Sequence, residues 1–131
     1  MANLEIETRG KIALLTLNRP ERRNAIDDAT IEAIETFFSR PPAGVKAVVL
    51  RATGEHFCAG LDLQEHYDLG RGPVEFMRMC QNWHRAFDAM QFGGLPVIAA
   101  LKGAVVGGGL EIAAATHVRV AEKSTFFALP E

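Results

Sequence analysis

The sequence predicts an α/β fold, in which short buried strands alternate with amphipathic helices. Apolar runs of strand length cover residues 12–17, 47–50 and 97–101, and apolar residues recur at helical spacing over 31–38 and 74–90. Clusters of glycine and proline separate these segments. The chain has 131 residues, of which 48% are hydrophobic, so it can bury roughly two thirds of its unfolded surface around one core.

The first two strands are expected to form a hairpin, followed by a helix. Residues 4–8 alternate between apolar and polar, residues 12–17 form a second apolar run, and Gly10 stands between them at the turn. After a polar loop, Asp27 or Asp28 can cap the next helix. The apolar face of that helix consists of Ile31, Ile34, Phe37 and Phe38.

The middle of the chain predicts a strand, a short helix and a long helix. Residues 47–50 read Ala-Val-Val-Leu, a short buried strand. Residues 61–69 are expected to hold one or two helical turns, with Asp62 as a possible cap. Pro73 is well placed to begin the long helix, which Gly93 and Gly94 end. Its predicted buried stripe consists of Val74, Met77, Cys80, Phe87 and Met90.

The last third predicts strands around a glycine-rich turn. Residues 97–101 form a buried strand, Gly103 turns the chain, and a second short strand leads into Gly107–Gly109. These glycines open a helix of small residues over 110–115. Two further strands are expected over residues 118–121 and 125–127.

Composition and charge exclude several classes of protein. The apolar fraction and a formal net charge of −2 exclude a disordered chain and give no field for binding nucleic acid. No apolar run approaches the ~18 residues of a membrane span, and the N-terminus has no signal or transit pattern, so we expect a cytoplasmic protein. The two cysteines form no CxxC pair, and we expect no disulfide. His56 and His66 lack a third ligand at useful spacing, so we expect no metal site.

The glycine run predicts an anion or oxyanion site. A strand leads into Gly107–Gly109, which let a ligand approach the backbone, and the first N–H groups of the following helix have no internal acceptor. The run does not match a dinucleotide fingerprint, because Ile112 stands where its third glycine would be, and it lacks the Lys-Ser or Lys-Thr of a phosphate loop. A tight turn without a ligand remains the alternative.

Two glutamates and a second loop are candidate parts of this site. Glu111 lies in the first turn of the helix, where it either complements the helix dipole or serves as a base, and Glu131 follows the last strand. In the loop after residues 47–50, Gly60 allows a bend that could aim the Leu61 N–H into a cleft. The alternative, which composition alone favours, is an ordinary loop with Asp62 as a structural cap. Cys58 is expected to be a small buried hydrophobic residue rather than a nucleophile.

Taken together, these segments resemble the crotonase, or enoyl-CoA hydratase/isomerase, superfamily. In chain order, the likeness is carried by Leu17-Asn18-Arg19-Pro20 with Asn24-Ala25, Phe57-Cys58-Ala59-Gly60-Leu61-Asp62-Leu63, Pro96-Val97-Ile98-Ala99-Ala100 with Gly103 and Gly107-Gly108-Gly109-Leu110-Glu111, and Phe127-Ala128-Leu129-Pro130-Glu131. The resemblance implies a spiral of ββα units that forms two roughly perpendicular sheets. It also implies that residues 1–131 are the N-terminal part of an acyl-CoA-binding domain, whose core is incomplete without the C-terminal completion and oligomerisation helices.

The resemblance implies a site for acyl-CoA thioesters. The backbone N–H groups of Leu61 and Gly108 would form the oxyanion hole, and the substrate-binding residues would be Ala59, Leu61, Asp62, Leu63, Gln64, Gly107 and Gly108. Glu111 would help to activate water for attack on the β-carbon, and Glu131 would deliver a proton to the α-carbon. The implied reaction is syn hydration of 2-trans-enoyl-CoA to 3-hydroxyacyl-CoA.

Two other functions remain open at this point. One is an enoyl-CoA or dienoyl-CoA isomerase that moves a proton with Glu131 alone; Leu61, where well-known hydratases carry alanine, occurs in several isomerase-type members. The other is an inactive acyl-CoA-binding fragment or interaction subunit. No cofactor is expected beyond the coenzyme A of the substrate, no nucleic acid or membrane partner is expected, and the full-length chain would form a homotrimer or hexamer.

Overall fold

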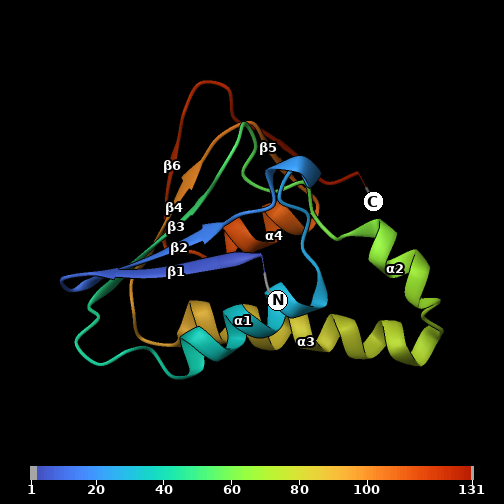
Figure 1. Ribbon diagram of the computed structural model, residues 1–131, viewed down its shortest axis with the longest axis horizontal. Coiled ribbons are helices and arrows are strands. Elements are labelled where there is room, and N and C mark those ends of the chain that lie inside the picture. The colour runs from blue at the N-terminus through green and yellow to red at the C-terminus, as the bar shows by residue number, and fades with distance from the viewer. Residues whose placement is uncertain (1–2, 131) are drawn as a thin grey trace.

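The structure, a computed structural model, describes residues 3–130. Its larger sheet has five strands in the order β1-β2-β3-β4-β6, in which β1 runs antiparallel to β2 and every other neighbouring pair is parallel (Figure 1). Its strands are β1 (Leu4–Arg9), β2 (Ile12–Leu17), β3 (Ala47–Ala52), β4 (Val97–Leu101) and β6 (Val118–Ala121). A smaller sheet pairs β5 (Ala104–Val106) with β7 (Phe126–Ala128) in parallel. The predicted α/β class with two sheets is therefore confirmed.

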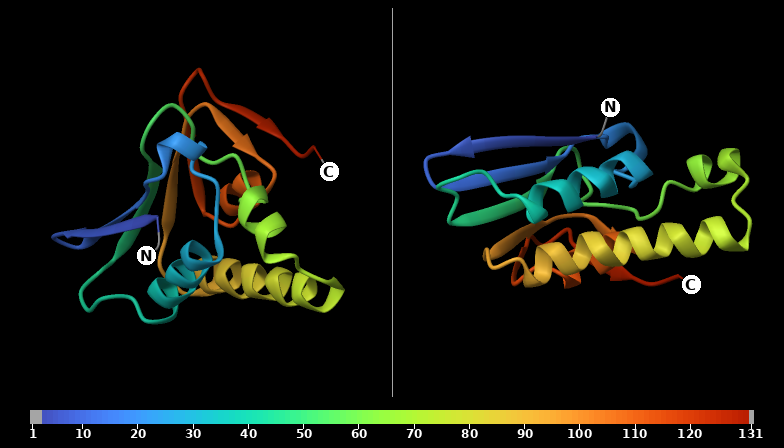
Figure 2. Two further views of the ribbon diagram at one scale, coloured as in Figure 1. Left: turned by 45° about the vertical axis from the view of Figure 1, so that its right-hand side comes forward. Right: turned by 90° about the horizontal axis from the view of Figure 1, so that it is seen from below.

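Four helices connect these strands within the described residues: α1 (Asp28–Ser39), α2 (Leu63–Leu69), α3 (Pro73–Phe92) and α4 (Gly108–Ala114). A single 3₁₀ turn, Pro20–Arg22, lies in the loop before α1. Helices α1 and α3 pack against each other, and α2 stands apart beyond the start of α3 (Figure 2). None of the described helices is long and apolar enough to cross a membrane.

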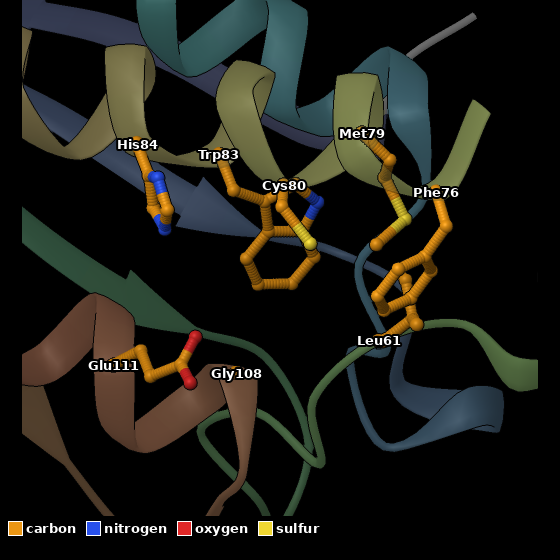
Figure 3. Close-up of a pocket in the computed structure, with 8 residues that line it drawn as sticks. All are labelled: Leu61, Phe76, Met79, Cys80, Trp83, His84, Gly108 and Glu111. Atoms are coloured by element: carbon orange, nitrogen blue, oxygen red, sulfur yellow. The ribbon is translucent and has the colours of Figure 1, made fainter. Parts of the chain in front are cut away.

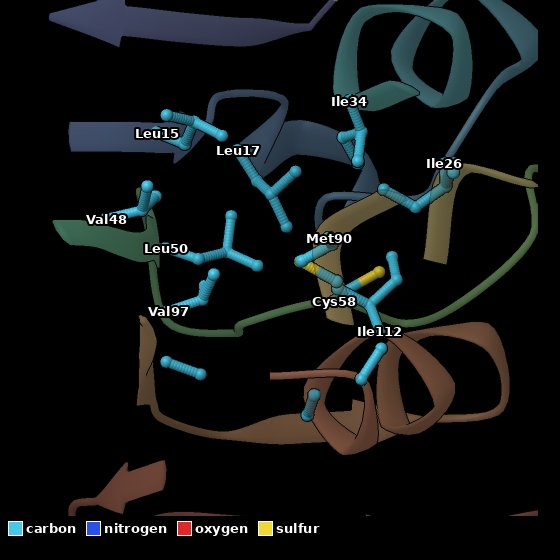
Figure 4. Close-up of a cluster of buried hydrophobic side chains, with 14 of the residues drawn as sticks. Leu15, Leu17, Ile26, Ile34, Val48, Leu50, Cys58, Met90, Val97 and Ile112 are labelled. Atoms are coloured by element: carbon cyan, nitrogen blue, oxygen red, sulfur yellow. The ribbon is translucent and has the colours of Figure 1, made fainter. Parts of the chain in front are cut away.

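The core lies between the larger sheet and three of the helices. Side chains from β2, β3 and β4 point toward Ile34 of α1, Met90 of α3 and Ile112 of α4 (Figure 4). These three residues are at most 1% exposed. By contrast, β6 and β7 keep large apolar side chains half exposed, namely Val118, Val120, Phe126 and Phe127. The core therefore covers the middle of the sheet but not the strands near residue 130.

Local sequence signals fixed most of the element boundaries. Gly10 turns the β1–β2 hairpin with a φ of 59°, and Asp27 caps α1 by accepting a hydrogen bond from the Thr30 N–H at 2.9 Å. The predicted face of α1 is buried in full. Other boundaries moved by one or two residues: β3 runs to Ala52 rather than to residue 50, α4 begins at Gly108 rather than at residue 110, and β7 lies one residue later than predicted.

The predicted stripe on α3 is wrong in its first half. Val74 and Met77 are about half exposed, at 51% and 52%. The buried face consists instead of Met79, Trp83, Ala86 and Met90. The first turns of α3 extend past α1 and the sheet, and Val74 and Met77 stay half exposed there (Figures 1 and 2). Periodicity alone indicated a helix but could not locate the part of it that lies against the core.

Candidate active site

The loop that follows β3 is held on both of its sides by backbone hydrogen bonds. On one side, the Cys58 N–H donates to the Ala104 carbonyl, and the Val106 N–H donates to the Cys58 carbonyl, each at 3.1 Å. On the other side, Ile26 donates to the Gly60 carbonyl at 2.8 Å and accepts from the Asp62 N–H at 2.9 Å. Because N–H groups alternate in direction along an extended chain, the Leu61 N–H points away from Ile26. It has no acceptor among residues 3–130.

The glycine run places a second N–H group beside this loop. Gly107 has a φ of 56° and donates to the Ala128 carbonyl at 2.8 Å, which ties the turn to β7. Gly108 then begins α4, and its N–H also finds no acceptor within the described part of the chain. A Cβ atom at Gly60 would lie 3.2 Å from the Gly108 nitrogen, so the two loops are in close contact.

Each glycine of the run meets a different steric demand. Gly107 takes a backbone conformation that other residues rarely adopt. A Cβ at Gly108 would lie 2.5 Å from Cζ3 of Trp83, and a Cβ at Gly109 would collide with the Cys58 carbonyl. The run is therefore needed for close packing of two loops against each other and against α3.

A cavity of about 230 Å³ opens between these loops and α3, and we call it the Glu111 cavity (Figure 3). Its lining is mostly apolar, with one carboxylate: Leu61, Phe76, Met79, Cys80, Trp83, His84, Gly108 and Glu111. Leu61 and Gly108, which carry the unpaired N–H groups, lie across the cavity from α3. A cavity of this kind fits an apolar ligand that carries one oxygen able to accept two hydrogen bonds.

Asp62 anchors the residue that follows the Leu61 N–H. One of its carboxylate oxygens accepts from the Gln64 and Glu65 N–H groups at 3.1 Å, which caps α2, and the other accepts from Nη1 of Arg19 at 2.6 Å. Burial by itself would raise the pKa of Asp62, but the hydrogen bond and charge of Arg19 together with the two amides hold it below its usual value. Asp62 is therefore a charged, fixed anchor for the loop.

Asn24 and Arg71 lock the neighbouring segments. Asn24, which is 1% exposed, accepts from the Arg19 N–H at 2.7 Å and donates to the Thr53 and His56 carbonyls at 2.9 Å. Arg71 donates to both oxygens of Asp28 at 2.6 Å, which joins the α2–α3 turn to α1. Both ends of α2 are thus attached to the loop that precedes α1 or to α1 itself.

The structure brings together three of the predicted site residues and separates others. Leu61, Gly108 and Glu111 line one cavity. Asp62 and Gly107 lie directly behind that wall, and Ala59 is half-buried in the same loop. Leu63 and Gln64 are exposed on the first turn of α2, and Leu63 is 72% exposed. Glu131 lies outside the described residues, so its predicted place beside Glu111 stays a prediction.

Sequence reasoning missed part of the opposite wall. From the sequence, Met77, Cys80 and Trp83 were possible lining residues, with a core stripe as the favoured alternative. Cys80 and Trp83 do line the cavity, together with Phe76, Met79 and His84, whereas Met77 is half exposed. Their spacing of three and four residues marks one face of a helix, so the signal was present. It could not be separated from an ordinary core stripe without knowing what faces that side.

Cys58 is a buried structural residue, as predicted. It is fully buried, and burial raises the pKa of its thiol to about 12, with the Gly60 N–H as a weaker opposing influence. A thiol in this state is inert as a nucleophile near neutral pH. Within residues 3–130, no three side chains of His, Cys, Asp or Glu lie close enough to hold a metal ion together.

Comparison with known proteins identifies the family. The sequence profile described as enoyl-CoA hydratase/isomerase matches residues 7–131, and the chain belongs to this family. It is 42% identical over 124 residues to mevalonyl-coenzyme A hydratase of Aspergillus fumigatus, covering 92% of this chain and 44% of that protein. It is 31% identical over 131 residues to the peroxisomal Delta(3,5)-Delta(2,4)-dienoyl-CoA isomerase of Arabidopsis thaliana, covering 89% of this chain and 46% of that one.

Solved structures agree with this assignment. The structure of an enoyl-CoA hydratase/isomerase from Xanthobacter autotrophicus Py2 matches 99% of this chain and 49% of its own, with a TM-score of 0.92 at 31% identity. The predicted crotonase fold is therefore confirmed. The chain spans about half the length of the curated relatives that it matches.

Proposed function

We propose that the site hydrates 2-trans-enoyl-CoA thioesters to 3-hydroxyacyl-CoA. The observation that carries this proposal is the pair of unpaired N–H groups, at Leu61 and Gly108, on the wall of the cavity that also holds the Glu111 carboxylate. Two unpaired N–H donors on the wall of one cavity suit a carbonyl oxygen that gains negative charge. A carboxylate in the same cavity suits a step that handles water or a proton.

The proposed reaction begins with the thioester oxygen between the two N–H groups. The oxygen of a water molecule bonds to the β-carbon, the electrons of the carbon–carbon double bond move toward the carbonyl, and an enolate forms. Both N–H donors stabilise this charged state more than the neutral substrate, because the charge on the oxygen grows along the way. Donors fixed by the surrounding backbone bonds need no reorganisation during the reaction.

Glu111 is the proposed group that orients the water and accepts its proton. It is exposed at the cavity, and its carboxylate points into the space below His84 and Trp83 in Figure 3. Glu131 is the proposed donor of the proton that the α-carbon receives. In this scheme one water molecule is consumed: one of its hydrogens stays on the new hydroxyl group and the other passes to Glu111. Glu131 loses the proton that the α-carbon gains, and return of a proton from Glu111 to Glu131 through solvent restores both carboxyl groups.

The remaining parts of the proposal concern the substrate handle and the assembly. The loop with Ala59, Asp62, Leu63 and Gln64, together with Gly107, would hold the thioester end of coenzyme A. No cofactor is needed beyond that coenzyme A. The full-length protein is proposed to form a homotrimer or hexamer. Here and below, the full-length protein is the longest natural form that carries this sequence.

An isomerase is the second candidate. It is favoured by the similarity to the dienoyl-CoA isomerase of Arabidopsis thaliana. In that case the same N–H pair would stabilise the enolate, but one carboxylate would move a proton between two carbons and no water would add. The two reactions differ in whether the product gains a hydroxyl group.

The decisive experiment uses the full-length protein with crotonyl-CoA and with a 3-enoyl-CoA, followed by product analysis. Hydration predicts 3-hydroxybutyryl-CoA from crotonyl-CoA, whereas isomerisation alone predicts conversion of only the 3-enoyl substrate. Glu111→Gln should lower the kcat for hydration by roughly 10²- to 10⁴-fold. Glu32→Gln, on the exposed side of α1, is the matched control. Unchanged hydration by the Glu111→Gln variant would remove Glu111 from the mechanism.

A further inference from the structure

The indole nitrogen of Trp83 is buried without a partner. Trp83 is 6% exposed, and its Nε1 has no hydrogen-bond acceptor among the described residues. Buried tryptophan N–H groups usually find an acceptor, since an unpaired one costs about 1–3 kcal/mol. The ring also lines the Glu111 cavity, so a ligand bound in that cavity is a candidate partner for the unpaired N–H.

The position of the ring is fixed by its neighbours. The far edge of its six-membered ring lies against Gly108, since a Cβ there would be 2.5 Å from Cζ3 and 2.7 Å from Cη2. Phe87 contacts the ring edge-to-face at a centroid distance of 5.6 Å. The nitrogen belongs to the five-membered ring, on the side away from Gly108. Figure 3 shows it directed toward Phe76 and Met79 and away from the Glu111 carboxylate.

That end of the cavity offers the nitrogen no good acceptor. The side chains there are Leu61, Phe76, Met79 and Cys80. The sulfur atoms of Met79 and Cys80 are only weak acceptors. Cys80 lies beside the ring, because residues three apart on a helix are neighbours (Figure 3). A wholly aliphatic ligand would leave the N–H unpaired, whereas a ligand with an oxygen acceptor would pair it.

We propose that the acyl group bound in the Glu111 cavity carries a hydroxyl or carbonyl oxygen beyond its β-carbon, and that Trp83 Nε1–H donates a hydrogen bond to this oxygen. The inference rests on the proposed function, since it takes the thioester oxygen to lie between Leu61 and Gly108 and the β-carbon to lie near Glu111. Nε1 lies away from both Gly108 and the Glu111 carboxylate, and the acyl atoms that follow the β-carbon are the ones that we propose to reach it. Trp83 is accordingly a residue that determines acyl specificity.

The test compares two acyl-CoA thioesters of equal length on the full-length protein. The probes are 2-hexenoyl-CoA and 5-hydroxy-2-hexenoyl-CoA for turnover, and hexanoyl-CoA and 5-hydroxyhexanoyl-CoA for binding by calorimetry. The wild-type protein should favour the hydroxylated member of each pair by about tenfold, the factor expected for one well-placed hydrogen bond. Site-specific replacement of Trp83 by benzothienylalanine, which exchanges the N–H for sulfur at nearly the same shape, should abolish this preference, as should Trp83→Phe.

Phe87→Leu is the matched control, because it loosens the ring contact and keeps the N–H, so the preference should survive. Absence of any preference in the wild-type protein overturns the inference, whether or not the variants fold. Persistence of the preference after the benzothienyl replacement overturns it as well, and so does a full-length structure in which Nε1 donates to a protein oxygen. A binding preference without turnover of either enoyl-CoA supports the inference and rejects the proposed reaction. Turnover of 2-hexenoyl-CoA and 5-hydroxy-2-hexenoyl-CoA at equal kcat/KM supports the proposed reaction and overturns the inference about Trp83.

Discussion

Replacing Asp62 by alanine is expected to lower the free energy of unfolding by about 3 kcal/mol. The carboxylate caps α2 through two N–H groups, and loss of such a cap costs about 1 kcal/mol. The substitution also strands Arg19, whose side chain is only 19% exposed and donates to Asp62 at 2.6 Å. A hydrogen bond to a charged group contributes about 1.5–3 kcal/mol. The second contribution is the larger one, and it should vanish when Arg19 is also removed.

Urea unfolding of the full-length protein, followed by circular dichroism, measures this effect. Asp62→Ala, Arg19→Ala and the double variant form a cycle, in which the coupling free energy should be about 1–2 kcal/mol, more than for an exposed pair. Asp88→Ala, at an exposed position on α3, should change stability by less than about 0.5 kcal/mol. A coupling free energy near zero would refute the view that this ion pair holds the loop.

The same ion pair should make stability depend on acid pH. The folded state holds the pKa of Asp62 below its unfolded value of about 3.9, so the unfolded state takes up a proton first as the pH falls. The stabilisation is therefore present above the unfolded pKa and is lost as the pH falls through the folded pKa. Asp62→Asn should be destabilised relative to wild type at pH 7, and the gap should narrow below about pH 4. A gap of constant size down to pH 3 would contradict the assigned shift.

Three further outcomes test other contacts. Gly109→Ala should destabilise the full-length protein by at least about 1–3 kcal/mol in urea unfolding, because its Cβ would collide with the Cys58 carbonyl; a neutral effect would show that the two loops can separate. At pH 8, iodoacetamide should label Cys80 but not Cys58, whose thiol pKa is about 12, and mass spectrometry after urea should find both labelled. Arg71→Ala should lower the free energy of unfolding by about 2–4 kcal/mol in thermal or urea unfolding, because the arginine side chain is 6% exposed and donates two hydrogen bonds to Asp28. A change under about 0.5 kcal/mol would show that this contact contributes little to stability.

The parts that the sequence predicted well depend on local chemistry. Asp27 and Asp62 cap helices where cap residues were expected, and Gly10 and Gly103 take positive φ at predicted turns. These features need only a few neighbouring residues, so one segment contains the whole signal. The bend at Gly60 is local as well, but composition alone favoured an ordinary loop there, and the role of the Leu61 N–H followed from the family resemblance.

The parts that it predicted poorly depend on contacts between distant segments. Met77 has the right type and spacing for a core residue, yet α3 extends past the body of the protein at that point and leaves it exposed. Met79 and Trp83 are buried because α1, Gly108 and the loop after β3 lie on their side of the helix. Which side of a helix faces the core is decided by tertiary packing, and no local spacing rule contains that information.

The two unpaired N–H groups follow from the complete pairing of the groups around them. Ala59 donates to the Arg23 carbonyl at 3.0 Å, Asp62 donates to Ile26, and Gly107 donates to Ala128. Each loop is thereby fixed on both sides of the residue whose N–H remains unpaired. Leu61 and Gly108 are half-buried, and an unpaired N–H is ordinary in the first turn of a helix, so what distinguishes this pair is its place on the wall of one cavity with a carboxylate. In the proposed mechanism an oxygen that gains negative charge would lie beside these two groups, where donors held by the surrounding backbone would stabilise it without reorganisation.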